Sequence, residues 1–150
     1  MQALPEGPVA EKLVNNDAGF DGCFGCSTSN PFGLKLSFER VGDDIVSRTN
    51  VSREYAGYRA FAHGGVIATM LDEAMGWAML HIAGYYGVTV SLNVTYRRPV
   101  IVGRPVVLSA RVTGQRNSRL FLDARIEDER GRLLARAEGE WSIVREERAA

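Results

Sequence analysis

Gly64, Gly65 and Asp72 are the residues of this sequence whose types and spacing could do chemistry. The glycine pair precedes an apolar run that predicts a helix, and the first N–H groups of a helix have no partner inside it. These N–H groups, with the partial positive charge of the helix start, can polarise a carbonyl that approaches without interference from a Cβ. Asp72 stands inside the apolar run, where desolvation raises the pKa of a carboxyl group and suits it to act as a base.

The distance between these residues limits how they can cooperate. Gly64 and Asp72 are eight positions apart, which is about 12 Å along a helix that rises ~1.5 Å per residue. One carbonyl group cannot touch both residues within one chain. Either the two do not share a reaction, or a site forms between two chains, with Gly64 from one and Asp72 from the other.

The elements that must position these residues follow from the hydrophobic pattern. Residues 66–83 predict a long helix that is apolar on all sides and therefore buried, with Gly84 ending it. Alternating apolar and polar residues predict two strands before the helix and four after it. The expected strands cover residues 34–38, 45–51, 88–98, 105–114, 119–128 and 133–144. Hairpin-length turns between them indicate an antiparallel sheet curled around the helix, which is an α+β fold.

Composition excludes several classes of function. The chain has 150 residues, which fit one domain, and its 18 Lys and Arg balance its 18 Asp and Glu, which argues against a nucleic-acid partner. The start lacks the basic and apolar regions of a secretory signal, and charges interrupt the apolar helix, which argues against a membrane span. We expect a cytoplasmic protein with an irregular lead-in (1–22), one domain (23–144) and a charged tail (145–150).

Cys23 and Cys26 form a C-x-x-C pair in a segment rich in Gly, Ser and Asn. Zinc normally needs four ligands, and only His63 and His81 remain as other soft ligands. A thioredoxin-like motif would lie between a strand and a helix of a βαβ unit, which this segment does not provide. We expect a structural turn that carries two thiols, with a metal site or a redox role as the alternatives.

Three segments of the sequence, residues 23–34, 63–76 and 93–103, resemble the hotdog-fold acyl-CoA thioesterases of the phenylacetic-acid-degradation (PaaI-like) branch. The specific part is His-Gly-Gly at 63–65 with an acid nine residues after the histidine. The resemblance covers residues 23–144 and implies a hotdog fold that hydrolyses acyl-CoA to the free acid and CoA. It implies no metal and no cofactor besides the CoA of the substrate. It also implies a homodimer or homotetramer with active sites at the dimer interface, which selects the two-chain arrangement.

The resemblance assigns roles to individual residues. Gly64 N–H would polarise the thioester carbonyl, Asp72 would act as general base or nucleophile, and Thr89 would hold the attacking water. His63, which borders the glycines, would orient the substrate. Basic residues should contact the CoA phosphates. The further candidates for substrate binding are Gly65, Glu73, Asn93, Arg97, Arg98, Arg116, Asn117, Ser118 and Arg119.

Two of these assignments make geometric predictions. Strand alternation puts Asn93 on the same face as Thr89, where it would line the acyl pocket. Thr69 and Gly76, one turn either side of Asp72, would leave room for a ligand. Plainer interpretations stay open: a solvated helix edge would explain Asp72 and the glutamate that follows it, and ordinary strand or turn positions would explain the others.

Position 57 departs from the family pattern. Several relatives carry Asn or Gln six residues before the histidine, where the amide positions or polarises the thioester, but here that residue is Gly57. This departure favours, as an alternative, a non-catalytic protein that binds or senses acyl-CoA. A hotdog dehydratase that pairs His63 with Asp72 across the interface is a third reading, although the nine-residue spacing fits hydrolysis better.

Overall fold

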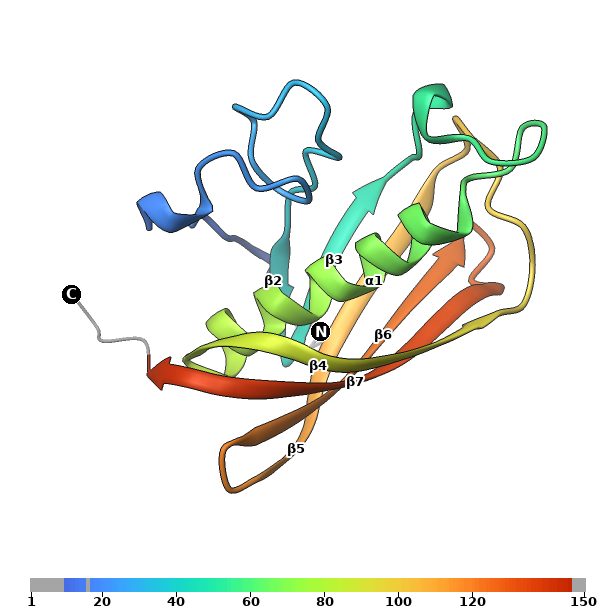
Figure 1. Ribbon diagram of the computed structural model, residues 1–150. Coiled ribbons are helices and arrows are strands. Elements are labelled where there is room, and N and C mark those ends of the chain that lie inside the picture. The colour runs from blue at the N-terminus through green and yellow to red at the C-terminus, as the bar shows by residue number, and fades with distance from the viewer. Residues whose placement is uncertain (1–9, 16, 147–150) are drawn as a thin grey trace, which may run out of the picture.

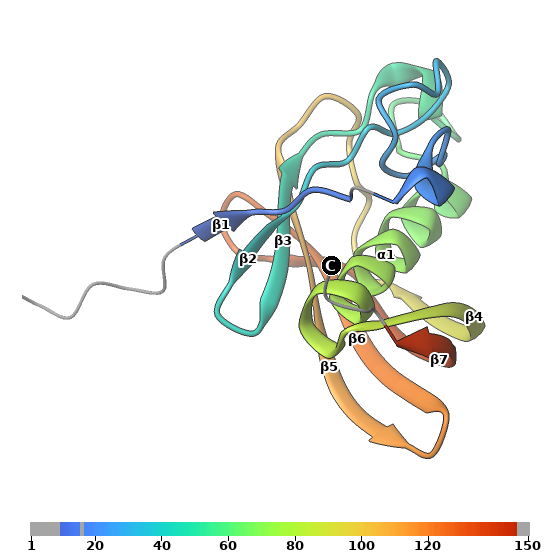
Figure 2. The same cartoon turned by 90° about the vertical axis from the view of Figure 1, so that its left-hand side faces the viewer.

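The computed structural model describes residues 10–15 and 17–146, so the rest of the expected lead-in and the tail from residue 147 lie outside the described residues. Within them, seven antiparallel strands form one sheet in the order β1-β2-β3-β5-β6-β7-β4. Figures 1 and 2 show this sheet curving around the helix α1. The expected α+β class, an antiparallel sheet wrapped around one long helix, is confirmed.

The bounds of the elements agree closely with the pattern in the second half of the chain. The strands are β1 (Ala10–Lys12), β2 (Glu39–Val41), β3 (Asp44–Thr49), β4 (Tyr85–Tyr96), β5 (Val106–Arg116), β6 (Arg119–Asp128) and β7 (Leu133–Glu146). The helices are α1 (Gly64–Ala78), its π-helical continuation η3 (Met79–Ala83), and the 3-10 turns η1 (Ala18–Phe20) and η2 (Arg53–Tyr55). None of the described helices is long and apolar enough to cross a membrane.

The hydrophobic core lies between α1 and the concave face of the sheet. Alternate residues of the long strands point toward the helix, and Leu108, Leu122 and Ile126 among them are at most 1% exposed. Met70 and Leu71 of α1 are buried to the same degree. Full burial of a side chain of this size contributes about 1.5–3 kcal/mol. These contacts therefore hold α1 in a fixed position relative to the strands.

One side of α1 remains accessible, contrary to the burial expected from its apolar circumference. Ala68, Thr69 and Asp72 are only half-buried. The reason is that this side of the helix borders β4, the last strand of the sheet, beyond which the described chain offers no further cover. The sheet thus covers the helix incompletely on the side that carries Asp72.

Both ends of the helical segment have residues that explain their positions. The helix begins at Gly64, two residues earlier than expected, because His63 caps it: its Nδ1 accepts a hydrogen bond of 2.9 Å from Gly65 N–H. The segment ends as predicted at Gly84, whose left-handed conformation (φ 76°) glycine adopts without steric cost.

The N-terminal part differs most from the pattern. Residues 34–38 alternate in burial as predicted but do not form a strand, because the left-handed backbone at Lys35 (φ 52°) interrupts the extended chain. Pairing begins at Glu39, in β2. The lead-in, expected to be irregular, contains the strand β1, which pairs with β2. At the other end, the first two residues of the expected tail belong to β7.

Candidate active site

The Asp72 carboxylate lies between α1 and β4, where Thr89 Oγ1 donates a hydrogen bond of 2.7 Å to Asp72 Oδ1. Burial raises the pKa of the Asp72 carboxyl above its ordinary value, and the hydrogen bond from Thr89 partly offsets this by favouring the charged form. A raised pKa is also what the apolar sequence around Asp72 predicts. The geometry brings together a carboxylate and a hydroxyl that could jointly hold a water molecule and accept its proton.

The space beside Asp72 is smaller than predicted. Gly76, expected to leave room for a ligand, is covered by the indole of Trp141: a Cβ added at Gly76 would lie 3.1 Å from Trp141 Cη2. Trp141 is the β7 residue that pairs with Thr89 of β4. The glycine therefore makes room for a core side chain, and a substrate must reach Asp72 from another side of the helix.

The start of α1 forms a second group of candidate residues. Within the described chain, Gly64 N–H has no hydrogen-bond partner, whereas Gly65 N–H is bound by His63 Nδ1. Tyr96 Oη donates a hydrogen bond of 2.7 Å to Gly64 O, in the peptide group that follows Gly64. Gly64 can thus offer its N–H to a carbonyl. The prediction that Gly65 binds substrate is wrong as far as its backbone N–H is concerned, because this N–H already donates a hydrogen bond to His63 Nδ1.

Tyr96 is a site residue that the sequence alone did not single out. A hollow of about 330 Å³ opens beside Gly64 and is lined by Tyr96, Arg97, Arg98 and the apolar Ile67. Its mixture of guanidinium groups and apolar surface suits a ligand with an anionic part and an acyl part. The part of β4 after the bulge carried a signal for Tyr96, because Leu92 and Val94 pack against the core and Tyr96 continues their alternation.

The remaining basic candidates lie far from this hollow in the same chain. The backbone N–H groups of Arg97 and Arg98 donate hydrogen bonds to Leu134 O, at the start of β7. The β5–β6 hairpin at residues 116–119 instead lies near the end of β7, where Arg119 pairs with Ser142. The eight residues between these points of β7 span about 26 Å at ~3.3 Å per residue. Figure 1 shows the hairpin at the end of the sheet opposite the start of α1. The expected basic cluster is therefore two separate groups within one chain.

The prediction that Asn93 shares a face with Thr89 is wrong. Thr89 pairs with Trp141, which is 7% exposed and faces the core, but Asn93 pairs with Glu138 on the exposed outer face. A shift in register between Thr89 and Ser91 marks a β-bulge, and the extra residue of a bulge reverses the alternation beyond it. Asn93 therefore does not line a pocket next to α1.

Glu73 does not join Asp72, although it was predicted to bind substrate. Successive residues of a helix point about 100° apart, and Glu73 faces the N-terminal segment. There it accepts a hydrogen bond of 3.1 Å from Trp77 Nε1 and one of 3.7 Å from Cys23 Sγ. Burial, and then the neighbouring Glu73 carboxylate, raise the pKa of the Cys26 thiol.

The backbone around Gly57 explains why no amide side chain stands there. A Cβ added at Gly57 would lie 3.1 Å from His63 Cα, closer than nearly all such contacts in proteins. The approach is held by two hydrogen bonds, from Gly57 N–H to Phe61 O (2.7 Å) and from His63 N–H to Tyr55 O (2.9 Å). The loop thus has no room for a longer side chain at this position without a shift of the backbone.

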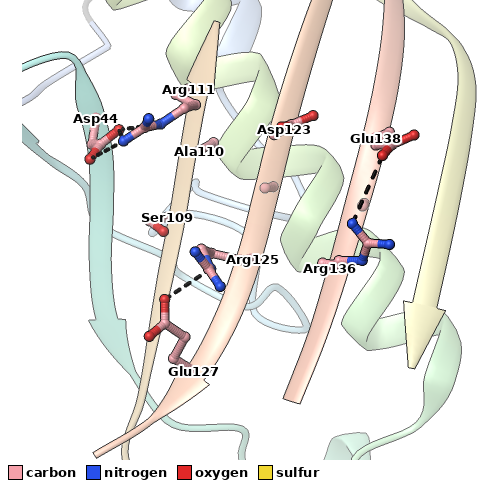
Figure 3. A pocket seen from close by; sticks show the side chains of 11 residues that line it. Asp44, Ser109, Ala110, Arg111, Asp123, Arg125, Glu127, Arg136 and Glu138 are labelled. Atoms are coloured by element: carbon pink, nitrogen blue, oxygen red, sulfur yellow. Dashed lines mark hydrogen bonds and ion pairs between the residues drawn. The ribbon is translucent and has the colours of Figure 1, made fainter. Parts of the chain in front are cut away.

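A larger hollow of about 400 Å³ lies on the outer face of the sheet, across the strands from α1 (Figure 3). Charged side chains line it, and several of them pair with each other: Arg111 with Asp44 at 2.9 Å and Arg125 with Glu127 at 2.9 Å. Neither Asp72 nor Gly64 reaches this face. Paired surface charges of this kind are ordinary for the solvated side of a sheet, so size alone does not make this hollow the active site.

Comparison with known proteins shows the family to which this chain belongs. A family model described as the thioesterase superfamily matches residues 60–135, just over half of the chain. Human acyl-coenzyme A thioesterase 13 is 29% identical over 93 residues, which cover 61% of this chain and 66% of the human protein. The Xenopus laevis acyl-coenzyme A thioesterase THEM4 is 34% identical over 71 residues, 47% of this chain and 31% of that protein. The chain thus matches slightly under two thirds of the human relative and about a third of the frog one.

Solved structures share the fold. A hypothetical thioesterase of Streptococcus pneumoniae, determined with coenzyme A, superposes with a TM-score of 0.67 at 21% identity over 71% of this chain and 85% of that one. The Escherichia coli PaaI protein of the phenylacetic acid degradation operon gives 0.69 at 18% identity over 76% and 83%. These likenesses confirm the hotdog fold. With the family model matching residues that include Gly64, Asp72 and Thr89, the chain belongs to the thioesterase superfamily.

Proposed function

We propose that this protein is an acyl-CoA thioesterase, which hydrolyses an acyl-CoA thioester to the free acid and CoA. The observation that carries the proposal is the half-buried Asp72 carboxylate, held by Thr89 at 2.7 Å, in a chain of the thioesterase superfamily. The substrate class is supported by the human relative, which is named an acyl-coenzyme A thioesterase, and by the coenzyme A in the Streptococcus pneumoniae structure.

The proposed reaction uses the carboxylate as a general base. Asp72 accepts a proton from a water molecule, whose oxygen attacks the thioester carbonyl carbon, while Gly64 N–H stabilises the negative charge that develops on the carbonyl oxygen. Collapse of the tetrahedral intermediate breaks the C–S bond, and the proton on Asp72 passes to the departing CoA sulfur. Thr89 orients the carboxylate through Oδ1, which leaves Oδ2 to the water. Direct attack by Asp72, through an anhydride that water then opens, uses the same position.

The reaction requires two chains, because about 12 Å of helix separates Gly64 from Asp72. We infer a homodimer in which Gly64 of one protomer works with Asp72 of the partner subunit; a homotetramer would contain two such dimers. The last strand of the sheet, β4, supports this inference. Val88 and Val90, on either side of Thr89, are 58% and 48% exposed, and an apolar strand at a sheet edge favours pairing with another chain.

The arginines divide between the two chains on the same reasoning. Arg97 and Arg98 lie beside Gly64 in one protomer, so they are the candidates for contact with a substrate bound at that helix start. The hairpin at residues 116–119 lies at the other end of the sheet and can serve only a site that another protomer completes.

Both cysteines are free thiols, the state that a reducing cytosol maintains, which supports a cytoplasmic location as part of the proposal.

A non-catalytic acyl-CoA binding or sensing protein is the second candidate. The close approach of Gly57 to His63 favours it, because this backbone would have to shift before position 57 could carry the amide that several relatives place there. Acyl-CoA would then bind without release of the CoA thiol.

A thiol-release assay over aromatic, short, medium and long acyl-CoAs tests both candidates. The expected result is turnover by the unchanged protein and loss of turnover in the isosteric variant Asp72→Asn. Asp123→Asn, an exposed aspartate on the outer face of the sheet, is the matched control and should keep full activity. Full activity in Asp72→Asn would overturn the role of Asp72, and tight binding of acyl-CoA without thiol release would favour the sensing protein.

A further inference from the structure

Two thiols and a carboxylate meet on the side of α1 that faces away from Asp72. Cys23 Sγ, Cys26 Sγ and a carboxylate oxygen of Glu73 all lie within 4.8 Å of one another, and all three side chains are half-buried. The proposed hydrolysis uses none of them. We infer that Cys23, Cys26 and Glu73 form a binding site for Zn²⁺.

The donor atoms and their separations fit this ion. Tetrahedral zinc binds sulfur at about 2.3 Å and carboxylate oxygen at about 2.0–2.2 Å, which puts neighbouring ligands roughly 3.5–3.8 Å apart. Cys23 Sγ lies 3.7 Å and 3.9 Å from the two carboxylate oxygens of Glu73, so small movements suffice to bind the ion. Magnesium and calcium select oxygen ligands, so the pair of sulfurs excludes them. With three protein ligands, the fourth position belongs to water.

The backbone of the cysteine loop is built around the carboxylate. A Cβ added at Gly25 would lie 2.3 Å from Glu73 Oε2 and 2.7 Å from Glu73 Cγ, so glycine lets the loop come this close without displacing the glutamate. The loop is held there by hydrogen bonds of its own, from Leu34 N–H to Phe24 O (2.8 Å) and from Leu36 N–H to Gly25 O (2.9 Å). These contacts tie the loop to residues 34–36 independently of any ion.

The carboxylate is oriented from its other side as well. Trp77 Nε1, one helical turn after Glu73, donates a hydrogen bond of 3.1 Å to Glu73 Oε1. Such a contact to a ligating group sets its direction and is part of most metal sites. Trp77 is itself packed against Phe38, with ring centroids 4.9 Å apart. The direction of the carboxylate is thus set by the core.

The two histidines considered with the cysteines are not needed for this site. His81 stacks on Trp77 (5.1 Å between centroids) and its Nε2 is bonded to Asn15 Oδ1 at 2.9 Å, two turns of helix beyond Glu73. His63 caps the start of α1. The third ligand is instead Glu73, fifty positions after Cys23, which the C-x-x-C spacing does not indicate. The expectation of a turn without metal is replaced by this proposal.

Cobalt provides the decisive test, because thiolate ligation of Co²⁺ gives an intense charge-transfer band in the near ultraviolet. The full untagged chain is reduced, freed of metal with a chelator and titrated with Co²⁺ in the absence of any acyl-CoA. We expect one equivalent to bind with the thiolate band, and Zn²⁺ to displace it. A wild-type protein that binds no Co²⁺, or binds it without the band, overturns the proposal whatever the variants do.

Variants identify the ligands. Cys23→Ser and Cys26→Ser should each weaken binding and lower the band per bound cobalt to about half, because one of the two thiolates remains. Glu73→Gln should weaken binding, whereas Glu129→Gln, a change at an exposed turn, should bind as the wild type does. Trp77→Phe keeps a ring but removes the N–H donor, and should weaken binding about 10- to 100-fold. A band of undiminished intensity in both serine variants would overturn the proposal. Since no acyl-CoA enters these measurements, their outcome is independent of whether the protein hydrolyses thioesters.

Discussion

Asp72 and Glu73 are neighbouring carboxylates on one helix, yet their surroundings differ in every respect that matters for chemistry. Asp72 faces the open side next to β4 and accepts a hydrogen bond from the hydroxyl of Thr89. Glu73 faces the segment that contains the cysteines and accepts hydrogen bonds from an indole and a thiol. The first environment suits proton transfer, and the second suits a cation. The packing around the helix, rather than the acid itself, decides the chemistry of each carboxylate.

The two sides also differ in completeness. The Asp72 side offers a base but no carbonyl-polarising N–H within reach, since Gly64 is about 12 Å away along the helix. The Glu73 side assembles its three ligands from one chain. We therefore expect the Asp72 side to depend on a second protomer and the Glu73 side to be independent of it.

The largest effect expected is that of Asp72→Asn on thioester hydrolysis. Removal of a general base typically lowers the rate about 10²- to 10⁴-fold, measured as kcat/KM for the best acyl-CoA of the panel. The same preparation should give an unchanged cobalt spectrum, because Asp72 points away from the cysteines. If the substitution removed the cobalt band as well, the two sides of the helix would not be independent.

The next effect tests the dependence on a second protomer. Val88→Lys puts a charge on the exposed edge of β4 and should convert the proposed dimer to a monomer that has lost most of its hydrolytic activity. Val14→Lys changes an equally exposed valine (59% against 58%) in the lead-in and should alter neither property. Analytical ultracentrifugation together with the thiol-release assay gives the answer. A monomeric Val88→Lys protein with full activity would refute the two-chain site.

Gly25→Ala tests the close contact on the Glu73 side. The added methyl group would overlap the Glu73 carboxylate at 2.3 Å, and such overpacking costs about 1–3 kcal/mol in the free energy of unfolding. Cobalt binding should weaken in parallel, because the carboxylate must move. Gly114→Ala is the matched control: a Cβ there meets nothing within 4 Å, and chemical denaturation should show no more than about 0.5 kcal/mol of change. Equal stability of the two variants would contradict the described contact.

The smallest effect concerns the pH dependence of hydrolysis in Thr89→Val. Base catalysis needs ionised Asp72, so activity rises as the pH passes through the pKa of this carboxyl. Burial raises that pKa and the Thr89 hydrogen bond lowers it, so the valine variant should have its acid limb at higher pH than the wild type. The rate at the plateau should fall about tenfold, which corresponds to roughly 1.4 kcal/mol, the lower end for a hydrogen bond to a charged group. An acid limb that moves to lower pH would contradict this description of Asp72.

The elements were largely predictable from the sequence. The bounds of β6 coincide with the expected residues 119–128. The helix and its end follow from a run of apolar residues and the glycine after it. These features depend on local periodicity, which a single chain segment contains. Asp72 and Thr89, two residues to which the family resemblance gave roles, lie in contact, and the roles themselves stay predictions.

The errors share a different physical origin. Side chains from distant segments determine the surroundings of Gly76 and Glu73. Trp141 covers Gly76, and Cys23 donates a hydrogen bond to Glu73. No periodicity within the helix reports such contacts. The prediction for Asn93 failed for a different reason. A bulge adds one residue to a strand and reverses the alternation beyond it, and the residue types of the strand do not reveal where it lies.

That bulge in β4 determines which residues of the strand can face the helix. Thr89 meets Asp72 and Tyr96 meets Gly64, so both face the helix although they are seven positions apart, an odd number that regular alternation would put on opposite faces. Deletion of the extra residue, such as Val90, would leave the two contacts an even number of positions apart in a regularly paired strand, so both would still face the helix. The bulge therefore compensates for the odd spacing: a regular strand with the present number of residues could make only one of the two contacts.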